Sequence, residues 1–250
     1  MINIILHGCN GKMGHVVASI VKNDPMCQIV AGIDSREGNA DFPVFTDISS
    51  CNISADVIID FSISTAVPSL LSYAKERQIP VIVCTTGLSE ETLALLESTS
   101  KDVAVLKSAN MSVGVNLLMS LLQKAAQLLA DSNFDIEIIE KHHNQKIDAP
   151  SGTALALADS INEAMEHKYT YVYDRSQVRE KRSPHEIGIH AVRGGSIVGE
   201  HSVIFAGQDE IIEFNHLAMS KEIFAVGAVK AAKYLAGKPA GLYTMKNVME

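Results

Sequence analysis

The first part of the chain alternates short apolar runs, rich in β-branched residues, with longer segments in which apolar positions recur at helical spacing. This alternation predicts a parallel sheet covered by helices. The predicted strands end near Gly, Asp, Ser or Thr and cover residues 2–6, 28–33, 57–60, 81–84 and 103–107. Crossover helices are expected between them, at residues 13–22, 65–77 and 90–100.

The pattern changes in the second half of the chain. A long helix is predicted over residues 113–130, and strict alternation over residues 135–140 then predicts a half-buried strand. A helix from Ser151 to about residue 166 follows. The next strand-like runs are separated by glycine-containing turns, which predicts an antiparallel meander. These runs cover residues 187–192, 197–205 and 211–217.

The C-terminal segment is again helical over residues 220–236, with Ser220 as the expected N-cap and Gly237 and Pro239 as stop signals. By its pattern alone this helix could belong to either half. The change of sheet type nevertheless predicts two domains, with a boundary near residue 108.

Composition narrows the class of protein. A hydrophobic content of 47% is sufficient for a packed core, and a net charge of -8 argues against general nucleic-acid binding. The sequence has no apolar run of membrane-spanning length and no signal-type N-terminus, so no membrane partner is expected. The four cysteines are far apart and form no C-x-x-C pair, which favours reduced thiols in a cytoplasm.

A glycine loop, residues 8–14, directly follows the first predicted strand. A strand that turns sharply into a helix brings backbone N–H groups and the positive helix end together, and small residues let a pyrophosphate approach them. The spacing is G-x-x-G-x-x-G rather than the usual G-x-G-x-x-G. Asp34 ends the next strand, where a ribose hydroxyl would lie, and Arg36 could meet a 2′-phosphate. The alternative is a structural glycine turn with Asp34 as a helix cap and Arg36 as an ordinary surface residue.

The first domain is therefore predicted to be a Rossmann-type parallel-sheet domain, and the fold class is α/β. Ligands of such sheets bind beyond the carboxyl ends of the strands, so small polar loops there are expected to contact the cofactor, although they could equally be ordinary turns. The predicted cofactor-binding residues are Gly8, Cys9, Asn10, Gly11, Lys12, Met13, Asp34, Arg36, Phe61, Cys84, Thr85, Thr86, Ser108, Ala109, Asn110 and Met111.

A histidine loop, residues 140–153, concentrates cations and proton donors in the second domain. His142 and His143 point in different directions on an extended chain, so one could transfer a proton while the other contacts a ligand. Residues 151–153, Ser-Gly-Thr, open a helix and offer N–H groups, a hydroxyl and the helix dipole to a carboxylate. With Lys146, the loop suits a small dianionic substrate.

Two other interpretations of the histidine loop remain open. A metal site is disfavoured because the two histidines are adjacent and no further residue completes an obvious ligand set, so no metal is expected. The other is a solvated basic loop followed by a capped helix.

Several motifs occur in a fixed order along the chain. They are Gly8-x-x-Gly11-Lys12-Met13-Gly14, Cys84-Thr85-Thr86-Gly87, residues 109–116 (ANMSVGVN), residues 135–143 (DIEIIEKHH), Lys146-x-Asp148-Ala149-Pro150-Ser151-Gly152-Thr153-Ala154 and Val198-Gly199-Glu200-His201. In these motifs the chain resembles the dihydrodipicolinate reductases from about residue 4 to its C-terminus. The block from Glu140 to Ala154 is highly specific to that family.

The resemblance implies an NADH- and/or NADPH-dependent reductase of diaminopimelate and lysine biosynthesis. Its substrate would be 4-hydroxy-tetrahydrodipicolinate, a small heterocyclic dicarboxylate that is reduced at C4 after loss of water. By position, His142 and Lys146 would be catalytic. The substrate carboxylates would be bound by His143, Ser151, Gly152 and Thr153.

The resemblance also implies a homotetramer. It makes residues 1–108 and 219–250 the dinucleotide-binding domain, and residues 109–218 a substrate-binding and oligomerisation domain with a mixed, largely antiparallel sheet. Cys9, Cys84 and Lys12 stand where the family commonly has Ala, Gly and Arg, and both thiols are expected to be shielded by bound NADH. A nucleotide-sensing regulator, or a dehydrogenase for another imino acid, would be the alternative functions.

Overall fold

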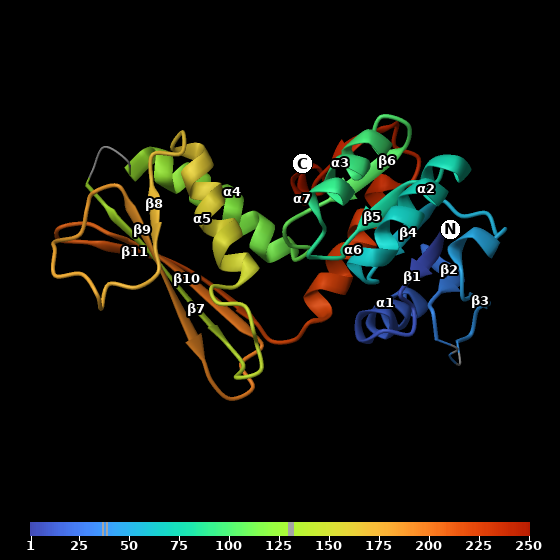
Figure 1. The fold of residues 1–250 in the computed structure, drawn as a ribbon, viewed down its shortest axis with the longest axis horizontal. Coiled ribbons are helices and arrows are strands. Elements are labelled where there is room, and N and C mark those ends of the chain that lie inside the picture. The colour runs from blue at the N-terminus through green and yellow to red at the C-terminus, as the bar shows by residue number, and fades with distance from the viewer. Residues whose placement is uncertain (37, 39, 130–132) are drawn as a thin grey trace. The chain divides into compact units, whose positions relative to one another are not determined.

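The computed structural model describes residues 1–36, 38, 40–129 and 133–250. These residues form two compact units, one of Met1–Val113 with Glu222–Glu250 and one of Gly114–Lys221 (Figure 1). The chain crosses between the units a few residues beyond the predicted positions, and the C-terminal helix belongs to the first unit. Within the described ranges, no helix is long and apolar enough to span a membrane.

The first unit contains a sheet whose strands all pair in parallel. The strand order is β12-β6-β5-β4-β1-β2-β3. The strands are β1 (Ile2–His7), β2 (Cys27–Ile33), β3 (Val44–Phe45), β4 (Val57–Asp60), β5 (Val81–Val83), β6 (Ala104–Lys107) and β12 (Gly241–Tyr243). The predicted parallel sheet is confirmed, whereas β3 and β12 are too short to give a periodic signal. The strand order changes direction at β1, which creates a topological switch point at the glycine loop.

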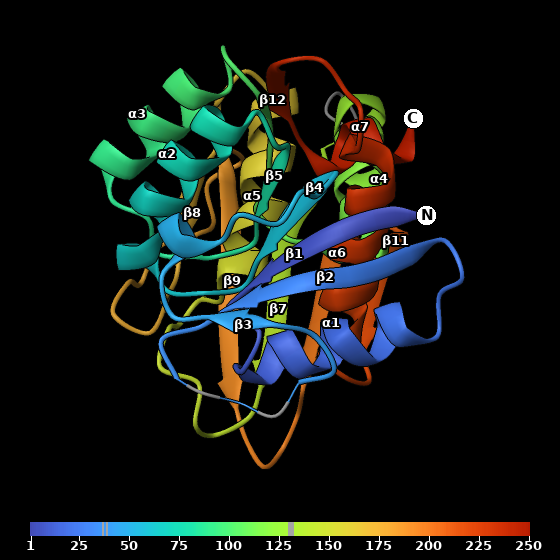
Figure 2. The same cartoon turned by 90° about the vertical axis from the view of Figure 1, so that its right-hand side faces the viewer.

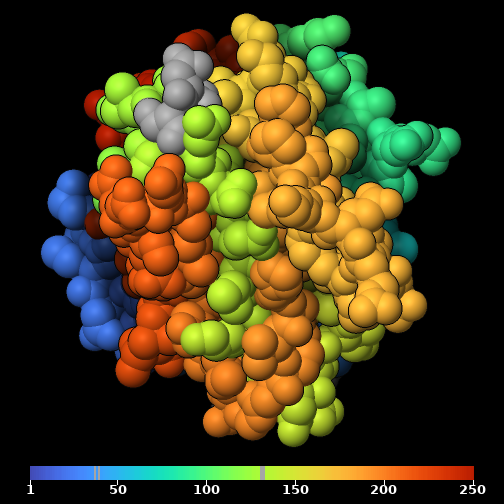
Figure 3. All heavy atoms as spheres, turned by 90° about the vertical axis from the view of Figure 1, so that its left-hand side faces the viewer, coloured from blue at the N-terminus to red at the C-terminus, as the bar shows by residue number. Residues whose placement is uncertain are grey.

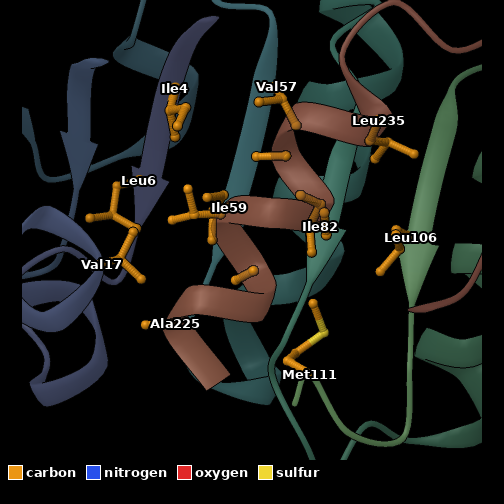
Figure 4. Close-up of a cluster of buried hydrophobic side chains, with 14 of the residues drawn as sticks. Ile4, Leu6, Val17, Val57, Ile59, Ile82, Leu106, Met111, Ala225 and Leu235 are labelled. Atoms are coloured by element: carbon orange, nitrogen blue, oxygen red, sulfur yellow. The ribbon is translucent and has the colours of Figure 1, made fainter. Parts of the chain in front are cut away.

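Helices cover both faces of this sheet (Figure 2). One face is covered by α1 (Lys12–Lys22), α6 (Glu222–Leu235) and α7 (Met245–Met249), and the other by α2 (Val67–Arg77) and α3 (Glu90–Thr99). Short 3-10 turns, η1 (Ile48–Ser50) and η2 (Ser64–Ala66), lie in the connections. In Figure 4 the side chains of Val57, Ile59 and Ile82 lie around α6, and Leu6 lies beside Val17 of α1. The backbone of Met111 approaches α6 so closely that residue 227 must be glycine. A Cβ on Gly227 would lie 1.7 Å from the carbonyl oxygen of Met111.

The second unit has a mixed sheet with the strand order β11-β10-β7-β9-β8. Its strands are β7 (Asp135–His142), β8 (Thr170–Val172), β9 (Glu186–Arg193), β10 (Gly199–Ala206) and β11 (Ile211–Ala218). Two helices, α4 (Val113–Leu129) and α5 (Gly152–Ala164), pack with one face of the sheet through a core of leucine, isoleucine and alanine. Residue 130, the predicted end of the first of these helices, lies outside the described residues.

The predicted three-stranded meander is wrong in one of its two steps. Strands β10 and β11 do pair antiparallel, but β7 lies between β10 and β9 and is parallel to β9. The Gly194-Gly195 turn is not a hairpin, because its backbone bonds to the end of β7 instead. Gly194 N donates to His142 O at 2.9 Å, and Asn144 N donates to Gly195 O at 3.2 Å. The sheet is therefore mixed, with two parallel and two antiparallel pairs among the described strands.

Candidate active site

The glycine loop has the geometry of an anion site. Gly8 adopts a φ of +79°, and a Cβ there would lie 2.5 Å from the carbonyl oxygen of Phe61. A Cβ on Gly14 would lie 2.3 Å from the carbonyl oxygen of Gly8, so both positions exclude a side chain. Helix α1 begins at Lys12, and its N-cap residue Gly11 brings no side-chain acceptor. The first-turn N–H groups and the positive helix end are therefore directed at any anion bound there.

A cavity of about 520 Å³ opens beside this loop. Five of the predicted cofactor-binding residues line it: Gly8, Gly11, Asp34, Arg36 and Phe61. Its size is in the range of small-molecule and cofactor sites, and it lies at the carboxyl ends of β1, β2 and β4.

Asp34 joins the glycine loop to the segment after β2. One carboxylate oxygen accepts a hydrogen bond from Asn10 N at 3.0 Å, and the other accepts one from Arg36 N at 3.1 Å. The Asn10 side chain returns a bond to Arg36 O at 2.6 Å. The Asp34 side chain is 8% exposed and that of Arg36 is 72% exposed, so the carboxylate is fixed while the guanidinium projects into solvent.

Two predicted cofactor residues direct their side chains into the core instead. Cys9 is 2% exposed, packs beside Gly32, and has its thiol pKa raised to about 11 by burial and the charge of Asp34. Met111 is 5% exposed and packs against α6. The side chains of these two residues are buried, so a ligand at the glycine loop would contact mainly their backbone. The expectation that bound NADH shields the Cys9 thiol stays a prediction.

The other predicted residues lie at the expected edge of the sheet or on the first turn of α1. Cys84, Thr85 and Thr86 follow β5, Ser108, Ala109 and Asn110 follow β6, and Lys12 and Met13 begin α1.

Sequence reasoning missed a buried polar row beneath the glycine loop. His7 and Asp60 end β1 and β4, lie opposite each other, and form a hydrogen bond of 2.9 Å between Nδ1 and Oδ1. Ser62 donates to the same carboxylate oxygen, whereas Oδ2 of Asp60 is buried without a hydrogen-bond partner in the described structure. Lys107, which ends β6, donates to Thr85 O at 3.1 Å, and burial lowers its pKa. Polar residues at the last position of otherwise apolar strands were the available signal.

In the second unit, the alternation along β7 places Glu140 and His142 on the same, helix-covered face of the sheet. His142 Nδ1 lies 2.6 Å from a carboxylate oxygen of Glu140, and both side chains are buried. Burial lowers the pKa of His142, the nearby charges of Lys146 and Arg193 act in the same direction, and Glu140 opposes them. A buried histidine with one nitrogen fixed by a carboxylate can exchange a proton through its other nitrogen.

The N-terminus of α5 lies beside this pair. The helix begins where predicted; Ser151 is its N-cap, and the Ser151 hydroxyl accepts a hydrogen bond from Ala154 N at 3.2 Å. The same hydroxyl forms a hydrogen bond of 3.0 Å with His201 Nε2. Its hydrogen bonds are therefore made within the protein rather than with a ligand. Gly152 is exposed, and a Cβ built there would meet nothing within 4 Å, which leaves open space at the helix end.

Lys146 and Asp148 form an ion pair of 2.7 Å at this helix end. The hydrogen bond and charge of Lys146, and the Gly152 backbone, hold the pKa of Asp148 below its usual value against the raising effect of its partial burial. In the part of the chain that the structure describes, the Asp148 carboxylate therefore lies in the positively charged surroundings where a substrate carboxylate would bind.

Three further residues of this cluster had no role in the sequence-based prediction: Glu140, Arg193 and His201. Arg193 donates to both carboxylate oxygens of Glu140, at 2.8 and 2.7 Å. The rings of His142 and His201 meet edge to face with centroids 5.2 Å apart. Glu140 and His142 are two residues apart on a predicted strand and therefore share one face of it, which could have indicated the role of Glu140.

The two units together define a class of protein. A parallel sheet with a glycine loop at its switch point, and a second unit that presents proton donors at a helix N-terminus, are the components of a two-domain Rossmann-type oxidoreductase.

Comparison with known proteins identifies the family. The model for the N-terminus of dihydrodipicolinate reductase matches residues 2–111, and the model for its C-terminus matches residues 114–249. The chain belongs to the dihydrodipicolinate reductase family, and it is therefore an enzyme of the oxidoreductase class. The resemblance inferred from the sequence motifs is confirmed.

Individual relatives match over the full length. The 4-hydroxy-tetrahydrodipicolinate reductase of Caldanaerobacter subterraneus subsp. tengcongensis is 54% identical over 250 residues, which covers 100% of this chain and 99% of that protein. The protein of the same name from Clostridium tetani is 52% identical and covers 98% of this chain and 96% of its own length. Among solved structures, the dipicolinate-bound dihydrodipicolinate reductase of Paenisporosarcina sp. TG-14 is similar with a TM-score of 0.79 and 25% identity, over 100% of both chains.

Proposed function

We propose that the protein reduces 4-hydroxy-tetrahydrodipicolinate to tetrahydrodipicolinate with NADH or NADPH, through an acid site built around His142. The reaction itself, in diaminopimelate and lysine biosynthesis, is the one named for the full-length relatives, and that expectation is confirmed. The observation that carries the assignment of the residues is the buried Glu140–His142 pair beside the N-terminus of α5.

The first unit would hold the nicotinamide nucleotide. Its pyrophosphate would lie at the glycine loop, where Gly8 and Gly14 leave room and the N–H groups at the start of α1 are unopposed by a side-chain cap. A ribose hydroxyl would bond to Asp34, whose oxygens retain acceptor capacity after the two backbone bonds. Bound there, the reduced nicotinamide supplies a hydride to the substrate ring.

The second unit would bind the substrate and supply protons. Hydride addition to a conjugated imine generates negative charge that a nearby acid must neutralise, and His142 and Lys146 are the candidate acids. The substrate carboxylates would be bound by His143, Gly152 and Thr153, because the Ser151 N–H already donates to a carboxylate oxygen of Glu140. Since the Ser151 hydroxyl is already bonded, its contribution is to fix the helix end rather than to contact the substrate.

The test is turnover on freshly generated substrate, followed by nicotinamide absorbance, together with NADH binding followed by fluorescence. His142→Gln and Lys146→Met should each lower kcat by about 10²-fold, the lower range for loss of a general acid, and leave the NADH Kd unchanged. Lys168→Met is the matched control, since Lys168 is an exposed lysine of the same unit. Unchanged turnover in both variants would remove these two assignments, and binding without any turnover would favour a nucleotide sensor or another imino-acid substrate.

The cofactor preference would depend on Arg36. Its side chain is 72% exposed and lies 3.6 Å from the Asp34 carboxylate, at the edge of the cavity where a 2′-phosphate would project. Arg36→Gln should lower kcat/KM for NADPH and leave that for NADH nearly unchanged. An equal loss for both cofactors would show that the arginine does not contact the 2′-phosphate.

We further propose a cytoplasmic homotetramer that assembles through the open face of the second sheet. This face is opposite the one covered by α4 and α5, and Figure 3 looks onto it. It carries exposed apolar residues, with Ile211 69% and Leu217 58% exposed at the two ends of β11 and Val192 44% exposed on β9. Mass measurement by light scattering should give four chains, and Ile211→Asp combined with Leu217→Asp should reduce that mass; an unchanged mass would exclude this face.

A further inference from the structure

The side chain of Glu140 forms hydrogen bonds with three residues, His142, Ser151 and Arg193. Its side chain is completely buried, and its two oxygens accept four bonds. Arg193 donates at 2.7 and 2.8 Å in a bidentate pair, Ser151 N donates at 2.9 Å, and His142 Nδ1 lies at 2.6 Å. Burial of an unpaired carboxylate has a large unfavourable free energy. The ion pair with Arg193 therefore allows Glu140 to be buried in its charged form.

The ionised state of Glu140 decides which nitrogen of His142 carries a proton. Burial raises the pKa of Glu140, but the bonds from Arg193, His142 and Ser151 outweigh burial and hold that pKa below its usual value. An ionised carboxylate can only accept, so Nδ1 of His142 must donate. The exchangeable position is then Nε2, and Gly199 lies beside it, where an added Cβ would be 3.1 Å away.

The same carboxylate connects three segments that carry the proposed acid site. Besides His142 on β7, it accepts a hydrogen bond from the N–H group of Ser151, the N-cap of α5. Through Arg193 it is also connected to the loop that precedes α5. Arg193 also donates to Asp148 O at 2.6 Å, and Asp148 is the partner of Lys146. Parallel pairing of β7 and β9 places Arg193 directly opposite His142, so the register of the two strands fixes the arrangement.

We propose that Glu140, held by Arg193, is a positioning residue that keeps a proton on Nδ1 of His142, so that Nε2 takes up a second proton and the doubly protonated ring delivers it to the substrate. This inference rests on the proposed role of His142, but its central claim concerns the state of that ring and can be measured without catalysis. The charged and titratable groups that face His142 are Glu140 on β7, Arg193 on β9, His201 on β10 and Lys146 in the histidine loop.

The first test is ¹⁵N NMR of the histidine rings in the wild-type protein, with His142 assigned by comparison with His142→Gln. The expected result, in alkaline solution where the ring is neutral, is a His142 with its proton on Nδ1. A neutral ring with its proton on Nε2 would overturn the proposal, whatever the kinetics show. This measurement needs no variant at position 140 to fold.

The second test replaces Glu140 with glutamine, which keeps the shape but removes the charge and adds a competing donor. We expect kcat to fall by about 10²-fold or more, since a wrong histidine tautomer in serine proteases costs about 10⁴-fold. Loss of the carboxylate also removes the group that favours the charged ring, so the alkaline limb of the kcat profile should move to lower pH. The NADH Kd should stay unchanged.

A double-mutant cycle separates positioning from general structural support. If Glu140 acts through His142, adding Glu140→Gln to His142→Gln should lower kcat by less than about threefold, because residues that act as a unit are strongly non-additive. The full loss of the single variant in that background would overturn the proposal. If instead His142→Gln alone had normal turnover, the role proposed for the histidine would fail, while the NMR result would still decide the tautomer.

The matched control is Glu137→Gln. Glu137 lies on the same strand and also binds an arginine and a histidine, Arg182 at 2.9 Å and His190 at 2.8 Å, but it is on the opposite face of the sheet. It should leave the pH profile and the His142 tautomer unchanged. A shift of the His142 signals in this variant equal to that in Glu140→Gln would show that any lost carboxylate on β7 disturbs the ring, and the positioning role would be withdrawn.

Discussion

His201 should make the protein lose stability in mildly acidic solution. Burial lowers its pKa from 6.5 to about 4, and the neighbouring charge of His142 acts in the same direction. Its ring is 4% exposed, its Nε2 is bonded to Ser151 Oγ, and its Nδ1 has no partner among the described residues. The folded protein therefore holds this ring neutral.

The direction of the effect follows from proton linkage. Between pH 6.5 and 4 the unfolded chain binds a proton at His201 and the folded chain does not, so stability falls as the pH is lowered through this window. Each pKa unit corresponds to about 1.4 kcal/mol, which gives a loss of about 2 kcal/mol by pH 5. For a chain of 250 residues this corresponds to a decrease in Tm of about 4–8 °C.

The assay is the thermal midpoint of the wild type and of His201→Gln at pH 7.5 and pH 5. Glutamine does not titrate and can still bond to Ser151, so its midpoint should decrease less over this interval, by about 4–8 °C. Taking the difference between the two proteins cancels the contributions of all other titrating groups. His15→Gln, which changes an exposed histidine on α1, should follow the wild type. Parallel decreases of the wild type and His201→Gln, within about 1 °C, would refute the reasoning.

Three further predictions follow from the site geometry. Gly8→Ala should abolish measurable NADH binding and lower stability by about 1–3 kcal/mol, because of its positive φ and the clash with Phe61 O; normal binding by fluorescence titration would contradict it. Asp148→Asn should strengthen binding of a pyridine dicarboxylate about two- to fivefold in calorimetry, since it removes the internal carboxylate that pairs with Lys146; weaker binding would oppose that reading. The Cys9 thiol should react slowly with iodoacetamide whether NADH is present or absent, because burial and a pKa of about 11 suppress the thiolate, and rapid labelling by mass spectrometry would disprove this.

The sequence predicted the sheets and helices well where periodicity is strong, but it could not predict strand order. Gly194-Gly195 has the composition of a hairpin turn, and only the bonds of this turn to the end of β7 show that β7 is inserted between β9 and β10. That error had a chemical consequence. Arg193 is 53 residues from Glu140, and the two meet only because β7 and β9 are parallel neighbours.

Side-chain direction was the other limit. The sequence correctly placed the start of the helix at residues 151–153, and Gly8, Asp34 and Arg36, all predicted to bind the cofactor, line one cavity. It could not show that Cys9 faces the core, because that depends on the space left by Gly32 on the neighbouring strand. Nearness to a motif predicts which loop contacts a ligand, whereas tertiary packing decides which atoms of that loop are available.

The division of the first unit between the two ends of the chain has a consequence for synthesis on the ribosome. Helix α6 and strand β12 belong to this unit but follow residue 221, so α6, which supplies Ala225, Ala228 and Leu235 to the buried core, is translated after the whole second unit. The second unit is continuous in sequence and can be completed first. Until α6 emerges, the part of this face that α1 does not cover carries exposed isoleucine and valine side chains. A nascent chain interrupted between the two units would therefore be a substrate for chaperones and proteases, even though every residue of its glycine loop had already been made.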